Sequence, residues 1–512
     1  MKLAIVYTRA SLGIQAPLVT VEAHISNGLP AFTIVGLPET AVKESKDRVR
    51  SAILNSQFDF PSRRITINLG PADLPKEGGR FDLPIALGIL AASQQIPGDC
   101  LDEYEFAGEL ALSGELRAIQ GALPVALGAR KANRILVVPR LNATEAALPG
   151  DNIIYAASTL LEITEHLSRR KRLHVFKQVL PPTTDSIRSE YDLCDVRGQM
   201  HAKRALEIAA AGGHSLLMIG PPGTGKTMLA SRLPNILPPL TLEETLEVIA
   251  IHSLIPNSQP ALQWGRRPFR APHHTASAVA LVGGGSHPRP GEISLAHQGV
   301  LFLDELPEFD RRVLEVLREP LESGTILISR AARQAEFPAR FQLITAMNPC
   351  PCGHLNDPKG RCQCTQEQIK RYRARLSGPF LDRIDMHIEV PALPMATLTR
   401  GNSTTEESST MVLKRVNAAV AKQRARSSRL NMRLTNQETQ KYCELNSSAQ
   451  TFFSNAIERL GLTGRSYHRV LRVARTIADL ANKEAIEIAH LAEALSFRRI
   501  EKLDIPYEPT LI

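Results

Sequence analysis

The stretch that most constrains the fold of this 512-residue chain is HSLLMIGPPGTGKTMLASRL, at residues 214–233. It begins with an apolar run, continues with a glycine-rich segment and ends with a helical pattern, which predicts a strand, a loop and a helix in that order. The loop GPPGTGKT, residues 220–227, has the G-x-x-x-x-G-K-[ST] spacing of a phosphate-binding loop. The chain is therefore expected to contain an α/β domain that binds a nucleotide at the end of a strand.

The residue types of this loop suit the phosphates of ATP. Gly220, Gly223 and Gly225 allow consecutive backbone N–H groups to face the phosphates, and the start of the helix adds its positive end. Lys226 is expected to reach the β- and γ-phosphates, and the Thr227 hydroxyl to ligate Mg²⁺. The whole predicted nucleotide-binding set is Gly220, Pro221, Pro222, Gly223, Thr224, Gly225, Lys226 and Thr227.

A second acidic element follows 78 residues after Lys226, in QGVLFLDELPEF. Its apolar residues predict a buried strand with Asp304 and Glu305 at its end, where ligands gather in open α/β sheets. We expect Asp304 to position Mg²⁺ and Glu305 to polarise the attacking water.

Three regions with different patterns are expected along the chain. Residues 1–168 mix β-branched runs with helical stretches, an α+β pattern, and 169–190 have the composition of a linker. Residues 191–397 alternate apolar strands with helices, as a parallel α/β sheet requires, and 398–512 have helical periodicity throughout once the polar stretch at 398–410 is passed.

Composition limits where the protein can reside and what kinds of partner it can bind. No apolar run approaches the ~18 residues that cross a bilayer, and the start MKLAIVYTRASLGIQ reads as a strand and not as a signal peptide, so we expect a cytoplasmic protein without a membrane partner. The net charge of +9 favours a polyanionic partner. Basic residues concentrate in 330–383 and 414–429, although solvated helix faces would give the same pattern.

Four of the seven cysteines lie in MNPCPCGHLNDPKGRCQC, residues 347–364. Cys350 and Cys352 form one pair and Cys362 and Cys364 the other, with nine residues between the pairs, enough for a loop to set four thiolates around a structural Zn²⁺. His354 is an alternative ligand, and packed free thiols, an iron–sulfur cluster and a redox switch remain alternatives to zinc. The site is expected to clamp the loop after residue 348 to the segment that leads to residue 383.

Two long blocks carry a family resemblance. FRAPHHTASAVALVGGGSHPRPGEISLAHQGVLFLDELPEF and PLESGTILISRAARQAEFPARFQLITAMNPCPCG resemble AAA+ ATPases of the magnesium chelatase-like group, specifically the ComM/YifB family. The resemblance covers essentially the whole chain. It implies an insertion in the second helix near residues 272–290 and a β-hairpin near 325–337.

The resemblance also assigns roles to single residues. Asn348 matches the first sensor of the γ-phosphate, and Arg383 in SGPFLDRIDMHIEV matches an arginine finger that acts on the neighbouring subunit's nucleotide. Arg465 matches the second sensor, with Arg469, Arg472 and Arg475 as competitors in the same helix. A finger acting between subunits implies a homo-hexameric ring.

The N-terminal region resembles the Lon-type peptidase domain, which needs a Ser nucleophile and a Lys. Arg80 stands at the Ser position, and Leu123 or the nearby Val125 stands at the Lys position, so we predict a domain without peptidase activity. Asp73, Lys76 and Asp82 are expected to belong to a structural ion-pair network.

Three functions remain open at this point. The first is a DNA motor, which the positive charge favours. The resemblance alone implies that this motor is a helicase that promotes branch migration during recombination or integration of transforming DNA, acting with other recombination proteins. Arg330 and Arg333 on the predicted hairpin would contact DNA phosphates, while His273 and His274 would contact DNA or stabilise a turn. The alternatives are a magnesium chelatase-type motor and an ATPase that remodels proteins.

Overall fold

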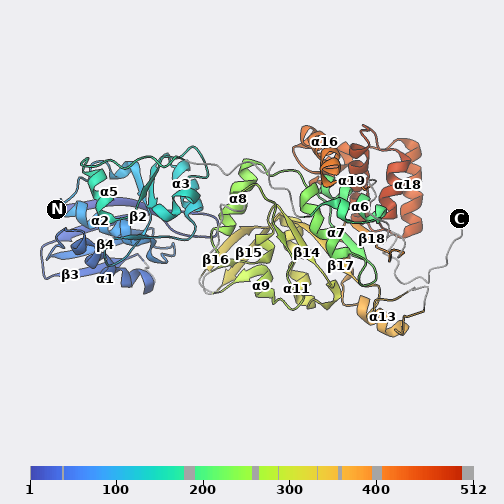
Figure 1. Cartoon of the computed structure of the whole chain (residues 1–512), viewed down its shortest axis with the longest axis horizontal. Coiled ribbons are helices and arrows are strands. Elements are labelled where there is room, and N and C mark those ends of the chain that lie inside the picture. The colour runs from blue at the N-terminus through green and yellow to red at the C-terminus, as the bar shows by residue number, and fades with distance from the viewer. Residues whose placement is uncertain are drawn as a thin grey trace.

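The computed structural model describes residues 2–36, 40–177, 191–255, 264–285, 288–330, 333–355, 360–394 and 406–498. Figure 1 shows these residues in an elongated molecule, with an N-terminal α/β unit at one end, a second α/β unit in the middle and a helical region at the other end. Within the described residues, no helix combines the length and the apolar character needed to cross a membrane.

The middle unit is built on a five-stranded sheet in which every neighbouring pair of strands is parallel. Its strand order is β11 (Phe269–Arg270), β14 (Val300–Leu303), β17 (Gln342–Met347), β10 (Leu216–Ile219) and β18 (Met386–Glu389). All residues of β10, β14 and β17 are buried, which explains why these strands read as continuous apolar runs. The predicted parallel sheet is confirmed, and its order places the carboxyl ends of β10, β14 and β17 side by side.

A helical region follows the sheet and shares a hydrophobic core with it. Its helices are α16 (Ser409–Ser427), α17 (Asn436–Tyr442), α18 (Ser447–Leu460), α19 (Gly464–Leu480) and α20 (Ile488–Ser496). One cluster of buried side chains includes Phe302 of β14, Val416 of α16 and Val473 of α19, and α6 (Met200–Gly212) contacts both α16 and α19. The predicted helical C-terminal region is therefore confirmed, while its predicted start at residue 398 lies outside the described residues.

The N-terminal unit contains a mixed seven-stranded sheet. Its order is β3 (Ala31–Val35), β4 (Arg64–Gly70), β2 (Leu18–Ser26), β1 (Lys2–Arg9), β5 (Tyr104–Phe106), β8 (Ile135–Pro139) and β9 (Ile154–Ala157). The pairs of β2 with β1 and with β4 are antiparallel, and the other neighbouring pairs are parallel. Helix α2 (Asp82–Ala92) contacts β1 and β2 and packs beside α1 (Thr40–Asn55). The mixed α/β class is thus confirmed, while the likeness to Lon-type peptidases stays a prediction.

The residues expected at the peptidase positions are buried in this unit. Arg80 donates from Nη2 to the Gln120 carbonyl at 2.9 Å, and Leu123 and Val125 are both buried on α3 (Ala122–Lys131). The expected ion-pair network is present in part, because Asp73 is close enough to Lys76 to oppose the lowering of its pKa by burial. Asp82 pairs with Arg48 at 2.8 Å, and Lys76 donates to the Pro71 carbonyl.

The two α/β units meet at α8 (Leu242–His252). Leu123 and Leu148 of the N-terminal unit join Leu246, Ile249 and Ala250 of α8 in one buried cluster, and Trp264 packs against it. A backbone hydrogen bond from Gly121 N to the Ser253 carbonyl, 3.1 Å long, crosses the same boundary. The position that would hold a peptidase lysine is therefore part of an interdomain contact.

Glu145 makes this contact pH-dependent. One of its carboxylate oxygens accepts a hydrogen bond from Leu123 N at 2.8 Å, and its side chain also bonds Ser253. Burial raises the pKa of Glu145 from 4.5 to about 7 in spite of these bonds. Because the folded protein holds this proton more tightly than the unfolded chain, the stabilisation is complete below pH 4.5 and is lost as the pH rises to about 7.

We predict that the stability difference between the wild type and Glu145→Gln changes with pH. Relative to the variant, the wild type should lose about 1–3 kcal/mol between pH 4.5 and 7.5. Urea unfolding followed by the fluorescence of Trp264, the single tryptophan, measures this at the interface itself. A difference that stays constant across this pH range would contradict the assignment.

Candidate nucleotide-binding site

The loop 220–227 joins β10 to α7 (Lys226–Arg232), as the sequence predicts. Gly223 and Gly225 adopt φ values of +75° and +86°, a region that glycine enters without strain. The Lys226 ammonium donates to the carbonyls of Gly220 at 2.7 Å and Pro221 at 2.9 Å. Burial lowers the pKa of Lys226, while Asp304 and Glu305 oppose that shift. The Lys226 ammonium group thus lies against the backbone of the loop.

The ends of the neighbouring strands supply the other predicted groups. The Asn348 carbonyl oxygen Oδ1, just after β17, lies 3.3 Å from Lys226 Nζ. Thr227 donates from its hydroxyl to Asp304 Oδ2 at 2.6 Å, and the Glu305 backbone N–H donates to Asp304 Oδ1 at 2.9 Å. These five residues come from three different strand ends and form one polar cluster.

The donor set fits Mg²⁺. Thr227 and Asp304 present two oxygen atoms 2.6 Å apart, and Mg²⁺ commonly takes one or two protein oxygens together with substrate phosphates and water. The hydroxyl and the carboxylate would hold the ion beside the phosphate loop.

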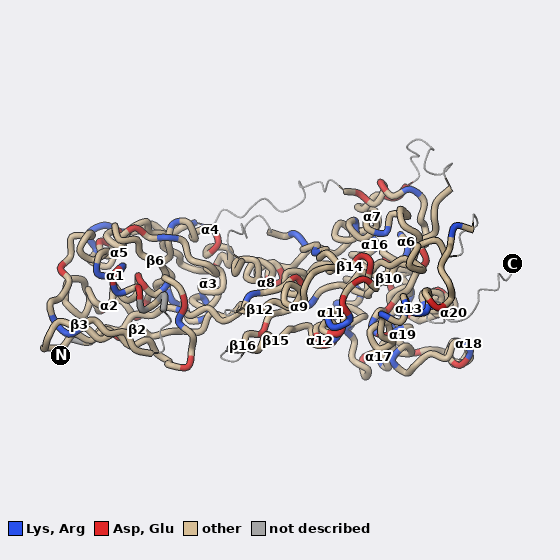
Figure 2. Tube along the Cα trace, turned by 90° about the horizontal axis from the view of Figure 1, so that it is seen from below, with Lys and Arg blue, Asp and Glu red and all other residues tan. Residues whose placement is uncertain are grey.

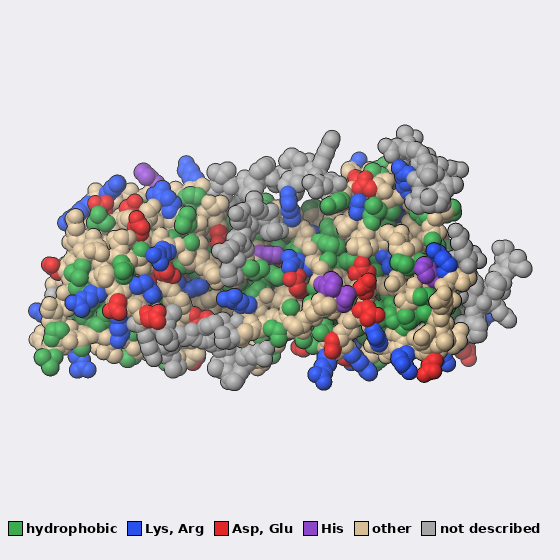
Figure 3. Space-filling view, turned by 60° about the horizontal axis from the view of Figure 1, so that its bottom comes forward, with side chains coloured by type: hydrophobic (Ala, Val, Ile, Leu, Met, Phe, Trp, Pro, Cys, Tyr) green, Lys and Arg blue, Asp and Glu red, His purple; other side chains and the backbone are tan. Residues whose placement is uncertain are grey.

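His274 contacts Glu305, a contact that the sequence analysis missed. Because β11 and β14 are parallel neighbours, the loop after β11 meets the end of β14, and His274 Nδ1 lies 3.0 Å from Glu305 Oε2. Glu305 itself has a φ of +52°. On the face shown in Figure 3, histidine side chains lie beside acidic ones over the middle of the molecule. His273 pairs with Thr275 Oγ1 at 2.8 Å, which agrees with the turn-stabilising alternative.

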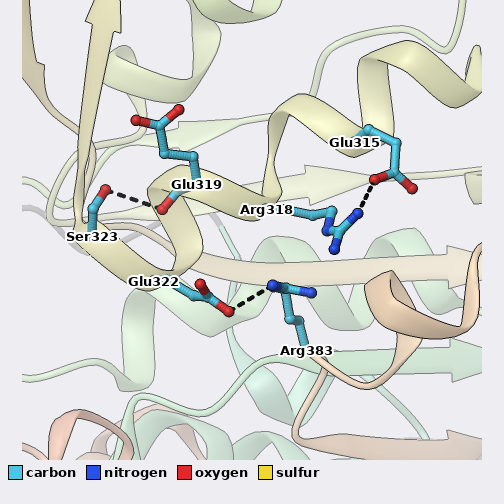
Figure 4. Close-up of a pocket in the computed structure, with 6 residues that line it drawn as sticks. All are labelled: Glu315, Arg318, Glu319, Glu322, Ser323 and Arg383. Carbon is cyan, nitrogen blue, oxygen red and sulfur yellow. Dashed lines mark hydrogen bonds and ion pairs between the residues drawn. The ribbon is translucent and has the colours of Figure 1, made fainter.

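Arg383 lies in a separate open pocket of about 430 Å³. Figure 4 shows it pointing toward Glu322 of α12 (Arg318–Ser323), and the two side chains form an ion pair of 2.7 Å. Arg383 is only 8% exposed and also donates to the Pro379 carbonyl at 2.7 Å, whereas Glu322 is 58% exposed. Arg318, paired with Glu315, lines the same pocket.

The arginines of α19 have different environments. Arg469 bonds Asp385 and the Arg383 carbonyl at 2.7 and 2.6 Å, Arg472 bonds Thr439, and Arg475 bonds Asp479. Arg465 lies exposed in the first turn of the helix. The three competitors for the second-sensor role are therefore engaged within the chain, and Arg465 stays the predicted sensor.

The predicted hairpin is present as β15 (Thr325–Arg330) and β16 (Arg333–Pro338). Arg330 and Arg333 pair with each other at its turn, while their side chains lie outside the described residues. The predicted insertion contains a short pair of strands, β12 (Gly283–Gly284) and β13 (Arg289–Pro290). A Cβ built on Gly283 would lie 2.8 Å from Ile328 Cδ1, so the insertion packs against the hairpin.

The four cysteines of the predicted zinc loop meet in space. Their sulfur atoms all lie within 4.8 Å of one another, and three of the separations are 3.4, 3.7 and 3.9 Å. Zn–S bonds of ~2.3 Å in a tetrahedron place sulfur atoms about 3.8 Å apart, so the spacing fits zinc. Backbone N–H groups of His354 and Gln363 hydrogen-bond Cys352 and lower its pKa, whereas burial and the neighbouring thiols raise the pKa of Cys350.

Comparison with known proteins now decides the family. The family described as "Magnesium chelatase, subunit ChlI" matches residues 192–398, its C-terminal family matches 406–498, and the ChlI subunit family matches 21–142. The chain is 53% identical to competence protein ComM of Haemophilus influenzae over 98% of this chain and 99% of the relative, and 51% identical to YifB of Escherichia coli over the full length of both. The chain belongs to the magnesium chelatase-like ComM/YifB family.

One further relative matches only a short part of the chain. Replication licensing factor Mcm6 of Drosophila melanogaster is 31% identical over 96 residues, 19% of this chain and 10% of that protein. The ComM/YifB matches, in contrast, span the sheet, the cysteine pairs and the helical region together. Family membership and the phosphate loop agree on an AAA+ ATPase of the magnesium chelatase type.

We predict that Arg469 and Arg465 affect different properties. Asp385 is buried, which by itself raises its pKa, but Arg469 and His214 together hold that pKa far below the usual range. Arg469→Ala should therefore destabilise the protein by about 3–5 kcal/mol, because it leaves a buried charge without its partner.

Arg465→Ala is the matched control on the same helix, and it should leave the melting temperature within about one degree while lowering ATPase activity. Thermal melts and ATPase rates of both variants check this. Equal melting temperatures for the two variants would contradict the structural role of Arg469.

Proposed function

We propose that this ComM/YifB protein is an ATP-driven, ring-forming DNA motor that promotes branch migration during homologous recombination or integration of transforming DNA. The observation that carries the ATPase part of the proposal is the meeting of Lys226 and Thr227, at the start of α7, with Asp304, Glu305 and Asn348, which follow β14 and β17. Phosphoryl transfer requires such positioning and charge stabilisation more than covalent chemistry. A cytoplasmic location and cooperation with recombination proteins are part of the same proposal.

Each residue has a defined task in hydrolysis. Lys226 stabilises the developing negative charge on the β- and γ-phosphates, and Asn348, within reach of Lys226, orients the water and the γ-phosphate. Mg²⁺, held by Thr227 and Asp304, would supply charge neutralisation between the same phosphates. Glu305 polarises the attacking water. To do so, it must either break its contact with His274 or use the carboxylate oxygen that does not face His274.

Arg383 would complete the site of a neighbouring subunit. Its place in an open pocket, with an exposed partner in Glu322, suits a side chain that is stored in an ion pair and transferred to a phosphate when a neighbour docks. A homo-hexameric ring provides such a neighbour for every site.

DNA is the substrate that the surface features favour. Two short hairpins, β12–β13 and β15–β16, pack together, and the second carries Arg330 and Arg333 at its turn. The net charge of +9 suits contacts with phosphates, although Figure 2 shows basic and acidic residues interspersed along the molecule, so local clusters must supply the contact. The name of the ComM relative and the partial match to Mcm6 support the same reading.

The ATPase rate of the purified protein tests this function. Forked, single-stranded and Holliday-junction DNA should each be compared with no DNA, and we expect stimulation that falls as salt rises. Arg330→Ala combined with Arg333→Ala should reduce the stimulation at least about tenfold while the rate without DNA is kept. Absence of both stimulation and low-salt binding would reject a DNA motor, and porphyrin-dependent stimulation would favour the chelatase alternative.

We also propose that the cysteine cluster holds one structural Zn²⁺. Four thiolates leave no position for a substrate, so the ion would organise the loop and not take part in hydrolysis. Elemental analysis should find about one zinc per chain, and Cys362→Ser should lower that value severalfold. Iron in place of zinc, or full zinc retention by the variant, would contradict the assignment.

A further inference from the structure

We infer that the cysteine loop, residues 350–355 and 360–364, positions the phosphate-binding loop of its own chain through a contact between Gly353 and Pro222. The inference rests on the proposed binding of ATP at residues 220–227 and adds a residue pair that controls its affinity. The sequence predicts that the cysteine loop connects the first sensor, Asn348, to the segment that leads to Arg383, and it does not predict this contact.

The contact depends on the absence of a side chain at residue 353. Gly353 has a φ of +79°, and its backbone N–H donates to the Cys350 carbonyl at 2.9 Å. A Cβ at this position would lie 2.6 Å from Pro222 Cδ and 3.3 Å from Pro222 Cγ. A separation of 2.6 Å between two carbon atoms is shorter than a van der Waals contact allows. The backbone of Gly353 therefore lies directly against the Pro222 ring.

The contact lies at an exposed part of the phosphate loop, Pro222 and Gly223. At the start of the loop, Gly220 N donates to the Met347 carbonyl at 3.2 Å, and a Cβ on Gly220 would lie 2.2 Å from the Val390 carbonyl oxygen. Three residues later, Gly223 has open space around its Cβ position. Pro222 lies between these two glycines, and it is exposed although it contacts Gly353.

The cysteine loop is itself anchored on both sides of the nucleotide site. Cys350 is fully buried, three residues before Gly353, and Arg373 of α13 (Gln366–Arg373) donates to the Pro349 carbonyl at 3.3 Å. Arg375, just beyond α13, donates to the Pro307 carbonyl at 3.1 Å, in the segment that follows Glu305. A metal that joins the four sulfur atoms would fix the turn at Gly353 relative to these anchors.

The physical consequence is preorganisation. A glycine-rich loop binds phosphates well only if its N–H groups already point at them, and every degree of freedom left open is lost on binding. A metal bound by the four cysteines would limit the motion of the Gly353 backbone. Because this backbone lies against the Pro222 ring, it would limit the motion of Pro222 as well. Metal occupancy therefore sets the affinity for ATP within one subunit, independently of the subunit boundary at Arg383.

The test compares two glycines of the same loop. Gly353→Ala and Gly360→Ala both place a side chain in the left-handed region, at φ +79° and +64°, but only the first meets Pro222, because a Cβ on Gly360 has nothing within 4 Å. With the full-length protein, we expect Gly353→Ala to raise the Kd of a fluorescent ATP analogue about tenfold and Gly360→Ala to change it less than about twofold. Zinc content and melting temperature are measured in parallel.

Adding Pro222→Ala tests whether the contact itself is responsible. Alanine lacks the Cγ and Cδ atoms that the new methyl group would strike, so Gly353→Ala with Pro222→Ala should bind the analogue more tightly than Gly353→Ala alone. Metal-depleted wild type should also bind it about tenfold more weakly than zinc-loaded protein.

Equal losses for the two glycine variants, additive losses in the double variant, or unchanged binding after metal removal would overturn the inference. A wild type that binds no nucleotide would instead reject the proposed function on which the inference rests.

Discussion

The parallel alignment of β10, β14 and β17 is the constraint on which the rest of the structure depends. Parallel neighbours end at the same edge of a sheet, so Lys226, Asp304 and Asn348 meet although up to 122 residues separate them. All residues of these strands are buried, so the three strands lie in the interior of the unit and only their ends carry polar groups to the surface. The position of every polar group at this edge follows from apolar packing beneath it.

The N-terminal unit is tied to the same sheet. Its contact with α8 continues into the middle unit through Glu247, which accepts a hydrogen bond from His297 Nε2 at 2.9 Å, while His297 Nδ1 accepts from Arg340 N at 3.0 Å. His297 precedes β14, and Arg340 precedes β17. His297 is buried and joins the two strands to α8, although the Glu247 side chain is 43% exposed. Glu247, His297 and Arg340 thus connect α8, which contacts the N-terminal unit, to the segments that precede β14 and β17.

Sequence reasoning identified the groups whose neighbours are local in the chain. The phosphate loop, the Asp304–Glu305 pair, the hairpin and the two cysteine pairs each carry their signal within about 20 residues, and the structure brings each set together as expected. The contacts of His274, Glu322 and Gly353 could not be predicted, because their partners lie on other elements. The strand order and the packing of one loop on another decide those contacts, and no local pattern encodes either.

Arg383 is proposed to complete the ATPase site of the next subunit. This role can be tested by mixing two inactive variants, Glu305→Gln and Arg383→Ala. If the finger acts between subunits, a Glu305 from one variant can meet an Arg383 from the other, and random mixing in equal amounts should restore about a quarter of the wild-type ATPase rate. A mixture as inactive as its two components would show that Arg383 serves its own chain, and would contradict the account.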